Sequence, residues 1–454
     1  MSTTAVSKSS HPAWVWCLGL FYLLVVGDGA LRKWFIPSQA TPLFVLKDLV
    51  LWGGYLTYVW KRDPFELPRP LQSTWVPLLL GAYISVVLLQ AANPRQPALI
   101  VAAVGLKYHL AFLPLVVLVP ALIADISQKT FVRGLWAYAL CIHLPIVAIG
   151  VYQFSQPPGA WINQYIGSAE QIASVAGNPR VTATFPYIGG FTPYLEFSTF
   201  LSISVFLTGF RWNNKGLKIL GGGLVAATAV VLPMTGSRSV IFIPAIALGV
   251  LLIAMPTRRQ WLYLVVAAAF SVFVISSVGG TWAFSGWRAL NERVEETEDE
   301  EAERRIMNVL KTPIDGLEKA GLFGYGVGTN ATPAPRLTTR SDWEGRFPGD
   351  RGSLRLVLEL GILGWLILVS LKLALLHVSF QAVRASRSSM EFIIAATAFC
   401  VLISNIVLPV VFNVVDSALY WGSAGAVLAV WSQQEVRRQK EARQPRARTS
   451  TTSM

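Results

Sequence analysis

Arginine side chains in four separate stretches are the residues of this chain best suited to chemistry. All lie beside or between long apolar segments, and they are Arg180, Arg238, the pair Arg304 and Arg305, and the pair Arg351 and Arg355. A guanidinium is permanently charged, forks onto phosphate oxygens, and is costly to hold near hydrocarbon without a partner. If these arginines converge, they form a pocket at the membrane surface suited to a lipid diphosphate. The alternative is that each guanidinium separately reaches the lipid headgroups.

Acidic side chains give a second, weaker signal. Glu196 falls inside an apolar segment, and an intramembrane carboxylate indicates a functional site by default, here with an arginine as its candidate partner. The alternative is a buried carboxylic acid that bonds to the backbone. The acidic run 292–303 lacks the Asp/Asn spacing and the glycine of a calcium loop, so it favours a solvated helix. We expect no metal and no cofactor.

The composition places these residues in a membrane protein. Of the 454 residues, 53% are hydrophobic and 14% are charged, whereas soluble domains carry roughly 25% charged residues. The formal charge of +13 does not indicate a nucleic-acid partner, because the lysines and arginines lie in short runs between apolar segments, as membrane topology requires. The three cysteines, Cys17, Cys141 and Cys400, are far apart within apolar segments and indicate small core residues.

The apolar segments predict an all-α membrane protein with about twelve transmembrane helices, since a span needs about 20 apolar residues. The predicted spans are 13–28, 42–60, 74–91, 99–124, 131–153, 187–209, 217–234, 238–255, 261–280, 354–377, 391–412 and 416–433. The chain then divides into a tail 1–12, a bundle 13–280 of about nine spans, a large loop 281–353, a bundle 354–433 of about three spans, and a basic tail 434–454.

Lysine and arginine predict the orientation. With a cytoplasmic N-terminus, the inside connections hold most of these residues, and the short outside loops hold only Arg32, Lys33, Arg95, Arg180 and Arg238. This asymmetry places both termini in the cytoplasm and the 281–353 loop outside, because long loops translocate regardless of their charge. We expect the basic C-terminal tail to be a disordered anchor that faces anionic lipid headgroups.

Four segments in this order resemble the O-antigen ligase and polymerase superfamily. They are Arg180 to Phe185, Thr235-Gly236-Ser237-Arg238, Gly321-Leu322-Phe323-Gly324-Tyr325-Gly326-Val327-Gly328, and Leu354 to Gly364 with Glu359. The family motifs are of the types R-x-x-G-T-F, T-G-S-R, P-L-x-G-x-G-x-G and H-N-x-x-L-x-x-L-x-E-x-G-x-x-G. The likeness covers roughly residues 97–433 and includes a large periplasmic loop late in the chain.

The resemblance implies a glycosyltransferase-like protein of the bacterial inner membrane. It would transfer or polymerise a glycan from an undecaprenyl-diphosphate-type lipid donor to a glycan or lipid acceptor at the outer face, in surface polysaccharide synthesis. Arg180, Arg238 and one of Arg304 or Arg305 would bind the diphosphate, with Arg351, Arg355, Glu359 and Glu196 in support.

One departure concerns the catalytic base. The family carries a histidine nine residues before the glutamate that matches Glu359, and here that position is Asp350. A carboxylate can act as a general base, so Asp350 is the candidate base. It can equally be an N-cap, because it precedes a helix at a position that favours Asp and Ser.

Two other classes compete with the enzyme. A transporter or flippase of a lipid-linked sugar or small solute fits the same number of spans, although the sequence shows no matching halves of the kind many transporters have. A non-enzymatic scaffold accounts for neither the arginines nor the loop.

Overall fold

The protein is helical throughout the part that the structure describes. The computed structural model describes residues 12–60, 75–166, 174–175, 177–237, 239–255, 311, 314–338, 352–406 and 408–449. Within these ranges the only strands are β1 (Ser174–Val175) and β2 (Asn178–Pro179), which pair antiparallel with Ser174 opposite Pro179. The predicted all-α class is therefore confirmed.

The helices follow the apolar segments of the sequence. They are α1 (Ala13–Ala30), α2 (Ala40–Val59), α4 (Val76–Ala91), α5 (Leu99–Leu110), α6 (Leu115–Asp125), α7 (Gln128–Tyr138), α8 (Leu144–Ser155), α9 (Ile188–Arg211), α10 (Lys215–Val231), α11 (Ser239–Ala254), α15 (Gly352–Ala385), α16 (Ser389–Ser404) and α17 (Val414–Thr449). Short turns of other helix types adjoin them: η1 (Leu31–Phe35), η2 (Pro37–Gln39), η3 (Ala139–His143), η4 (Pro233–Thr235), η5 (Ala334–Arg336) and η6 (Val410–Phe412).

Six helical runs in the described residues are long and apolar enough to cross a membrane, and α4, α11 and α16 are shorter apolar helices. The chain is thus a multi-pass membrane protein. The predicted span 99–124 is two helices, α5 and α6, joined by a turn. The predicted span 261–280 and most of the 281–353 loop lie outside the described residues, so the count of twelve spans, the loop and the orientation stay predictions.

Helix α9 lies at the centre of the bundle and contacts α10, α11, α16 and α17. Its buried residues fall on all sides of the helix, as expected of a helix surrounded by protein. Close packing on α10 depends on small residues: a Cβ built at Gly221 would lie 2.4 Å from the amide nitrogen of Phe206. Small residues let membrane helices approach at backbone distance.

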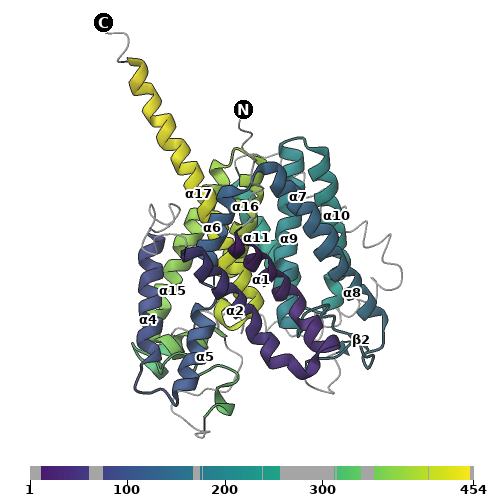
Figure 1. Cartoon of the computed structure of the whole chain (residues 1–454), viewed down its shortest axis with the longest axis vertical. Helices are drawn as coiled ribbons and strands as arrows, with labels where there is room; N and C mark the ends of the chain where they lie inside the picture. The colour runs from purple at the N-terminus through teal and green to yellow at the C-terminus, as the bar shows by residue number, and fades with distance from the viewer. Residues whose placement is uncertain are drawn as a thin grey trace, which may run out of the picture.

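Helix α17 reaches beyond the bundle. The sequence analysis expected a disordered tail from residue 434, but α17 continues as helix to Thr449. Residues 433–444 are rich in Gln, Glu, Lys, Arg and Ala, which have high helix propensity, and Pro445 follows them near the end of the helix. Figure 1 shows this yellow segment projecting away from the other helices, at the opposite end of the molecule from α5 and β2.

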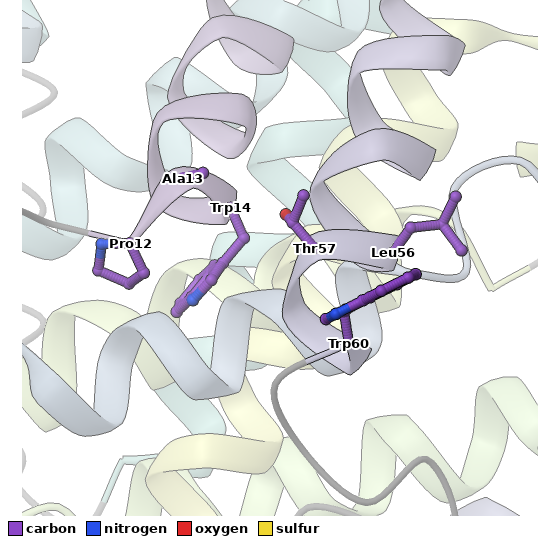
Figure 2. A pocket seen from close by; sticks show the side chains of 6 residues that line it. All are labelled: Pro12, Ala13, Trp14, Leu56, Thr57 and Trp60. Atoms are coloured by element: carbon purple, nitrogen blue, oxygen red, sulfur yellow. The ribbon is translucent and has the colours of Figure 1, made fainter.

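The bundle has two distinct ends. One end carries the last turn of α1, the first turn of α2, and β2, and we call it the loop end (Figure 1). The opposite end carries the C-terminal turns of α15 and α17, and we call it the tail end. At the start of α1 and the end of α2 lies an apolar cavity of about 230 Å³, with the indoles of Trp14 and Trp60 on either side (Figure 2). Trp60 is 90% exposed, as is typical of tryptophans at a membrane–water interface.

Candidate functional site

The segment that begins at Arg180 lies directly on the turn that precedes Arg238. The Arg180 Nε donates a hydrogen bond to the Thr235 carbonyl oxygen at 3.2 Å, and the Val181 amide donates to the Met234 carbonyl at 3.3 Å. The turn is possible because Gly236 adopts a left-handed conformation, with φ of 58°. Two stretches 55 residues apart are thus brought together at the loop end.

Two buried side chains also bind the segment that begins at Arg180. Lys33 is only 5% exposed, and its ammonium donates to the Thr182 hydroxyl at 3.1 Å and to the Ala183 carbonyl at 2.7 Å. The Gln153 carbonyl oxygen accepts the amides of Thr182 and Ala183 at 3.2 and 2.7 Å. Among the described residues no carboxylate forms an ion pair with Lys33.

Ala183 has a backbone conformation that suits glycine. Its φ is +46°, a left-handed value that costs a residue with a Cβ about 1–2 kcal/mol. The two hydrogen bonds from Gln153 and Lys33 hold it there. In the motif type R-x-x-G-T-F the fourth position is glycine, and counting from Arg180 this position is Ala183.

A network of ion pairs lies next to Lys33, between α1, α2 and α5. Lys47, 1% exposed, pairs with Asp28 at 2.9 Å, and Arg32 pairs with the same carboxylate at 3.5 Å. Lys107 pairs with Asp48 at 2.8 Å. Of these residues only Arg32 was noted in the sequence, as a basic residue of an outside loop; charges inside apolar segments were the available signal for the others.

Three of these cations lie close to one aromatic ring, that of Phe44. The charged groups of Lys107, Lys47 and Arg32 lie 3.7, 4.1 and 5.3 Å from the centre of the Phe44 ring. Cations are attracted to the face of an aromatic ring, more strongly where water is excluded. Arg32, Lys47 and Lys107 gather here with two carboxylates, Asp28 and Asp48, beside the buried amine of Lys33 that contacts the Arg180 segment.

The glycine segment 321–328 is inserted into a break in α15. Gly361 interrupts this helix with φ of 70° and ψ of 175°. Two amides of the glycine segment donate to carbonyls of the helix: Tyr325 to Leu358 at 2.8 Å and Gly326 to Glu359 at 3.1 Å. In the other direction, two helix amides donate to carbonyls of the glycine segment: Ile362 to Gly321 at 3.4 Å and Leu363 to Leu322 at 3.5 Å. The inserted segment therefore satisfies the backbone groups that the break leaves free.

Glycines in this segment allow turns and close approach to neighbouring backbone. Gly321, Gly324, Gly326 and Gly328 all have positive φ. The backbone at Gly328 also lies directly on α5: a Cβ built at Gly105 would lie 2.5 Å from the Gly328 nitrogen. A side chain at either position would push the segment away from the helix.

Behind the inserted segment, Glu359 is completely buried in a hydrogen-bonded network. Its Oε1 accepts the amide of Asn330 at 3.1 Å, and its Oε2 lies 3.1 Å from His109 Nε2. The other ring nitrogen, Nδ1, lies 2.7 Å from the Tyr83 hydroxyl. One neutral tautomer satisfies every member: Nε2–H donates to Glu359, and Nδ1 accepts from Tyr83.

His109 is the residue that sequence reasoning missed. The family resemblance directed attention to a histidine in the large loop, whereas His109 lies on α5, within an apolar segment. The structure joins it to the glutamate that carries the resemblance. The available signal was the presence of two ionisable residues in separate membrane segments, which favour each other as partners.

A cavity of about 730 Å³ opens beside the glycine segment at the loop end. It lies between the end of α4 and residues 319–325, and its polar lining includes Asn93, Arg95 and Lys319. Phe323, 68% exposed, and Tyr325 contribute aromatic rings, and the Arg95 guanidinium lies 5.4 Å from the Tyr325 ring. Aromatic rings together with amide and cationic side chains suit a polyhydroxylated ligand of this size.

Glu196 lies in the interior of the bundle. It is 8% exposed and close enough to Asp416 of α17 for the two carboxyl groups to interact, and Asp416 in turn interacts with Lys372 of α15. The Lys372 ammonium donates to the carbonyls of Asn405 and Leu408, where α16 has ended, at 3.0 and 2.6 Å. The arginine partner expected for Glu196 does not occur among the described residues; its charged neighbours come from α15 and α17.

A proline explains how α9 connects to this cluster. Pro193 lies inside α9 and has no amide hydrogen, so the Gly189 carbonyl lacks its usual donor within the helix. The Asn413 side chain supplies the missing donor. Its carbonyl oxygen accepts the amides of Val415 and Asp416 at 2.9 and 3.3 Å, which fixes the start of α17 on α9.

Most of the predicted site lies outside the described residues. Arg238, Arg304, Arg305, Asp350 and Arg351 are there, so their convergence and the choice of base or cap for Asp350 stay predictions. Arg355 is described: it is half-buried, with its guanidinium 5.9 Å from the centre of the Phe412 ring. In the described residues no cluster of three or more His, Cys, Asp or Glu side chains could hold a metal ion.

Comparisons with known proteins assign no family to the chain. No family model matches it, and neither a curated protein nor a solved structure shows a significant similarity.

Proposed function

We propose that the chain is a membrane glycosyltransferase of the O-antigen ligase and polymerase type. It transfers or polymerises a glycan carried on an undecaprenyl-diphosphate-type lipid, at the loop end of the bundle. The observation that carries the proposal is the contact between the Arg180 segment and the Thr235 turn, with the buried Lys33 against the same segment. This arrangement brings the Arg180 guanidinium, the Lys33 amine and the turn that leads to Arg238 to one place, where the diphosphate would bind.

The proposed reaction exchanges one bond at the sugar for another. The bond between the anomeric carbon and the diphosphate oxygen breaks, and the acceptor hydroxyl oxygen forms the new bond to that carbon. The lipid diphosphate leaves with its electron pair, and Arg180 stabilises the charge that develops on it. The acceptor proton passes to a base, for which Asp350 is the candidate.

Ala183 supports the resemblance on which the proposal depends. The position that the motif type fills with glycine has a left-handed backbone in this chain, where glycine is the residue of lowest cost. The other glycine motif is likewise placed on the helix that contains Glu359.

The test is the length of the surface polysaccharide in cells that depend on this gene. We expect Arg180→Ala to reduce polymer formation by about 100-fold or more, the usual cost of removing one charge-stabilising donor. Arg180→Lys keeps the charge without the fork and should recover only part of the activity. Arg336→Ala, which changes an arginine outside the cluster, is the matched control. Normal polymer in a stably expressed Arg180→Ala protein would refute the proposal.

A transporter is the second candidate, and one observation favours it. Glu196, Asp416 and Lys372 form a cluster of ionisable groups inside the bundle, and intramembrane ionisable residues often mark transport pathways. In proteoliposomes, a transporter would move a labelled lipid-linked sugar across the bilayer without lengthening it, and Glu196→Gln would slow this movement. Lengthening of the sugar by the purified protein would exclude a purely transporting role.

A further inference from the structure

A basic cavity lies at the tail end, far from the site described above. Its volume is about 270 Å³, and it is lined by the last turn of α15, the α15–α16 connection and α17. Four of the lining side chains are arginines, Arg384, Arg387, Arg437 and Arg438, and no carboxylate lines it. We call it the arginine pocket.

The surrounding carboxylates hold these arginines in place without filling the pocket. Three of the four arginines form ion pairs: Arg437 with Glu391 at 3.0 Å, Arg438 with Glu435 at 3.6 Å, and Arg387 with Glu441 through both guanidinium nitrogens. Arg384 has no carboxylate partner among the described residues, and its guanidinium lies 5.5 Å from the Phe380 ring. The pocket therefore presents ordered donors and one guanidinium whose charge is not neutralised.

An exposed apolar strip, Leu366 to Leu373, lies on the face of α15 that carries Arg384, with exposed His377 between the strip and the pocket. Leu366 and Leu373 are 48% and 52% exposed. They are two helical turns apart, and Arg384 follows Leu373 by three turns, so all three residues lie on one face of the helix. A soluble anion would make no use of this strip, whereas the acyl chain of a lipid would lie on it.

We propose that the arginine pocket binds the phosphate of an anionic phospholipid, with an acyl chain along the Leu366–Leu373 strip. Guanidinium groups bind phosphate oxygens through paired donors. The charge distribution of the sequence predicts that this end faces the cytoplasm, where the leaflet carries anionic lipid and where basic pockets between membrane helices bind such headgroups. The lipid fixes the ends of α15 and α17 relative to each other.

The experiment measures lipid binding to the full-length protein. The protein is placed in phosphatidylcholine nanodiscs that contain a defined fraction of phosphatidylglycerol, and retained lipid is counted by native mass spectrometry. We expect one retained phosphatidylglycerol molecule, and an affinity about fivefold lower in Arg384→Ala, the usual effect of one basic residue near an anionic lipid. Arg384→Lys should bind nearly as well as the wild type. Arg443→Ala is the matched control, since Arg443 lies on the same basic helix but does not line the pocket.

Three outcomes would overturn the proposal, one from the Arg443→Ala control and two from the choice of lipid or soluble phosphate. An equal loss in Arg443→Ala would show diffuse attraction by the basic helix. Equal retention of phosphatidylcholine would show an apolar site without charge selection. Displacement of phosphatidylglycerol by the same concentration of inorganic phosphate or glycerol phosphate would show a site for a free anion. Exposed Arg384 can be changed without disturbing the core, and gel filtration checks that each variant remains folded.

Discussion

The buried contact between His109 and Glu359 allows a quantitative prediction. Glu359→Ala removes a carboxylate that accepts two hydrogen bonds, one from His109 and one from the Asn330 amide. Hydrogen bonds to a charged acceptor contribute about 1.5–3 kcal/mol each, so the loss of two costs about 3–6 kcal/mol. We therefore expect Glu359→Ala to lower the free energy of unfolding by about 4 kcal/mol.

Glu359→Gln should cost far less, because the imidazole can adapt. A glutamine keeps one oxygen for the Asn330 amide and turns its NH₂ group toward His109. The histidine then needs its other tautomer, with Nε2 accepting and Nδ1–H donating to the Tyr83 hydroxyl, which lies 2.7 Å away. All partners remain satisfied, so we expect a loss of about 1 kcal/mol, the difference between a charge-assisted and a neutral hydrogen bond.

The assay is reversible unfolding in mixed detergent micelles, followed by circular dichroism and tryptophan fluorescence. A double-mutant cycle of Glu359→Ala with His109→Ala isolates the pair, and we expect a coupling of about 1.5–3 kcal/mol. Glu318→Ala, which removes an exposed carboxylate from the helical residues 314–320, should leave the transition unchanged. Effects of Glu359→Ala and His109→Ala that add to within about 0.5 kcal/mol would refute the network.

Three further changes test other parts of the structure, each by the shift of the thermal unfolding midpoint in detergent. Ala183→Gly should raise the midpoint, because it relieves about 1–2 kcal/mol of left-handed backbone strain. This gain exceeds the cost of about 0.4–1 kcal/mol that glycine causes by adding entropy to the unfolded chain. A lower midpoint would contradict the left-handed backbone at Ala183. Gly361→Ala should lower the midpoint more than Gly321→Ala: both have positive φ, but only at Gly361 would the new Cβ clash, 2.1 Å from a carbonyl oxygen. Lys47→Ala leaves the buried Asp28 with only its longer ion pair, to Arg32, and should lower the free energy of unfolding by about 3–5 kcal/mol. Lys47→Met combined with Asp28→Asn removes both charges and should recover much of this stability. Equal losses in the two variants would contradict the ion pair.

The sequence predicted the helices well because membrane-spanning segments can be recognised by their length and apolar composition. It also predicted that the Arg180 stretch and the Thr235 turn belong to the same end of the bundle, and the structure places them in contact. That outcome follows from counting spans: residues separated by an even number of crossings return to the same side. Helix breaks were harder to predict, since Ala111 to Pro114 is as apolar as the helices on either side.

The buried polar pairs could not be read from the sequence. Lys47 and Asp28 lie on different helices, and Glu359 and His109 are 250 residues apart. Pairing of this kind depends on which helices become neighbours and on their rotation, and neither is encoded in the apolar pattern of a single segment. For Glu196 the sequence suggested an arginine partner, whereas the ionisable neighbours that the structure gives it come from α15 and α17.

The interlocked backbones of α15 and the glycine segment limit how the molecule can be rearranged. Because Tyr325 and Gly326 occupy carbonyls that a continuous helix would use itself, excising the segment would expose orphan polar groups in a membrane protein, where they are costly. A chimera that receives this segment from another protein must receive the broken helix with it. The same contacts predict that residues 321–326 and the break at Gly361 tolerate change only together.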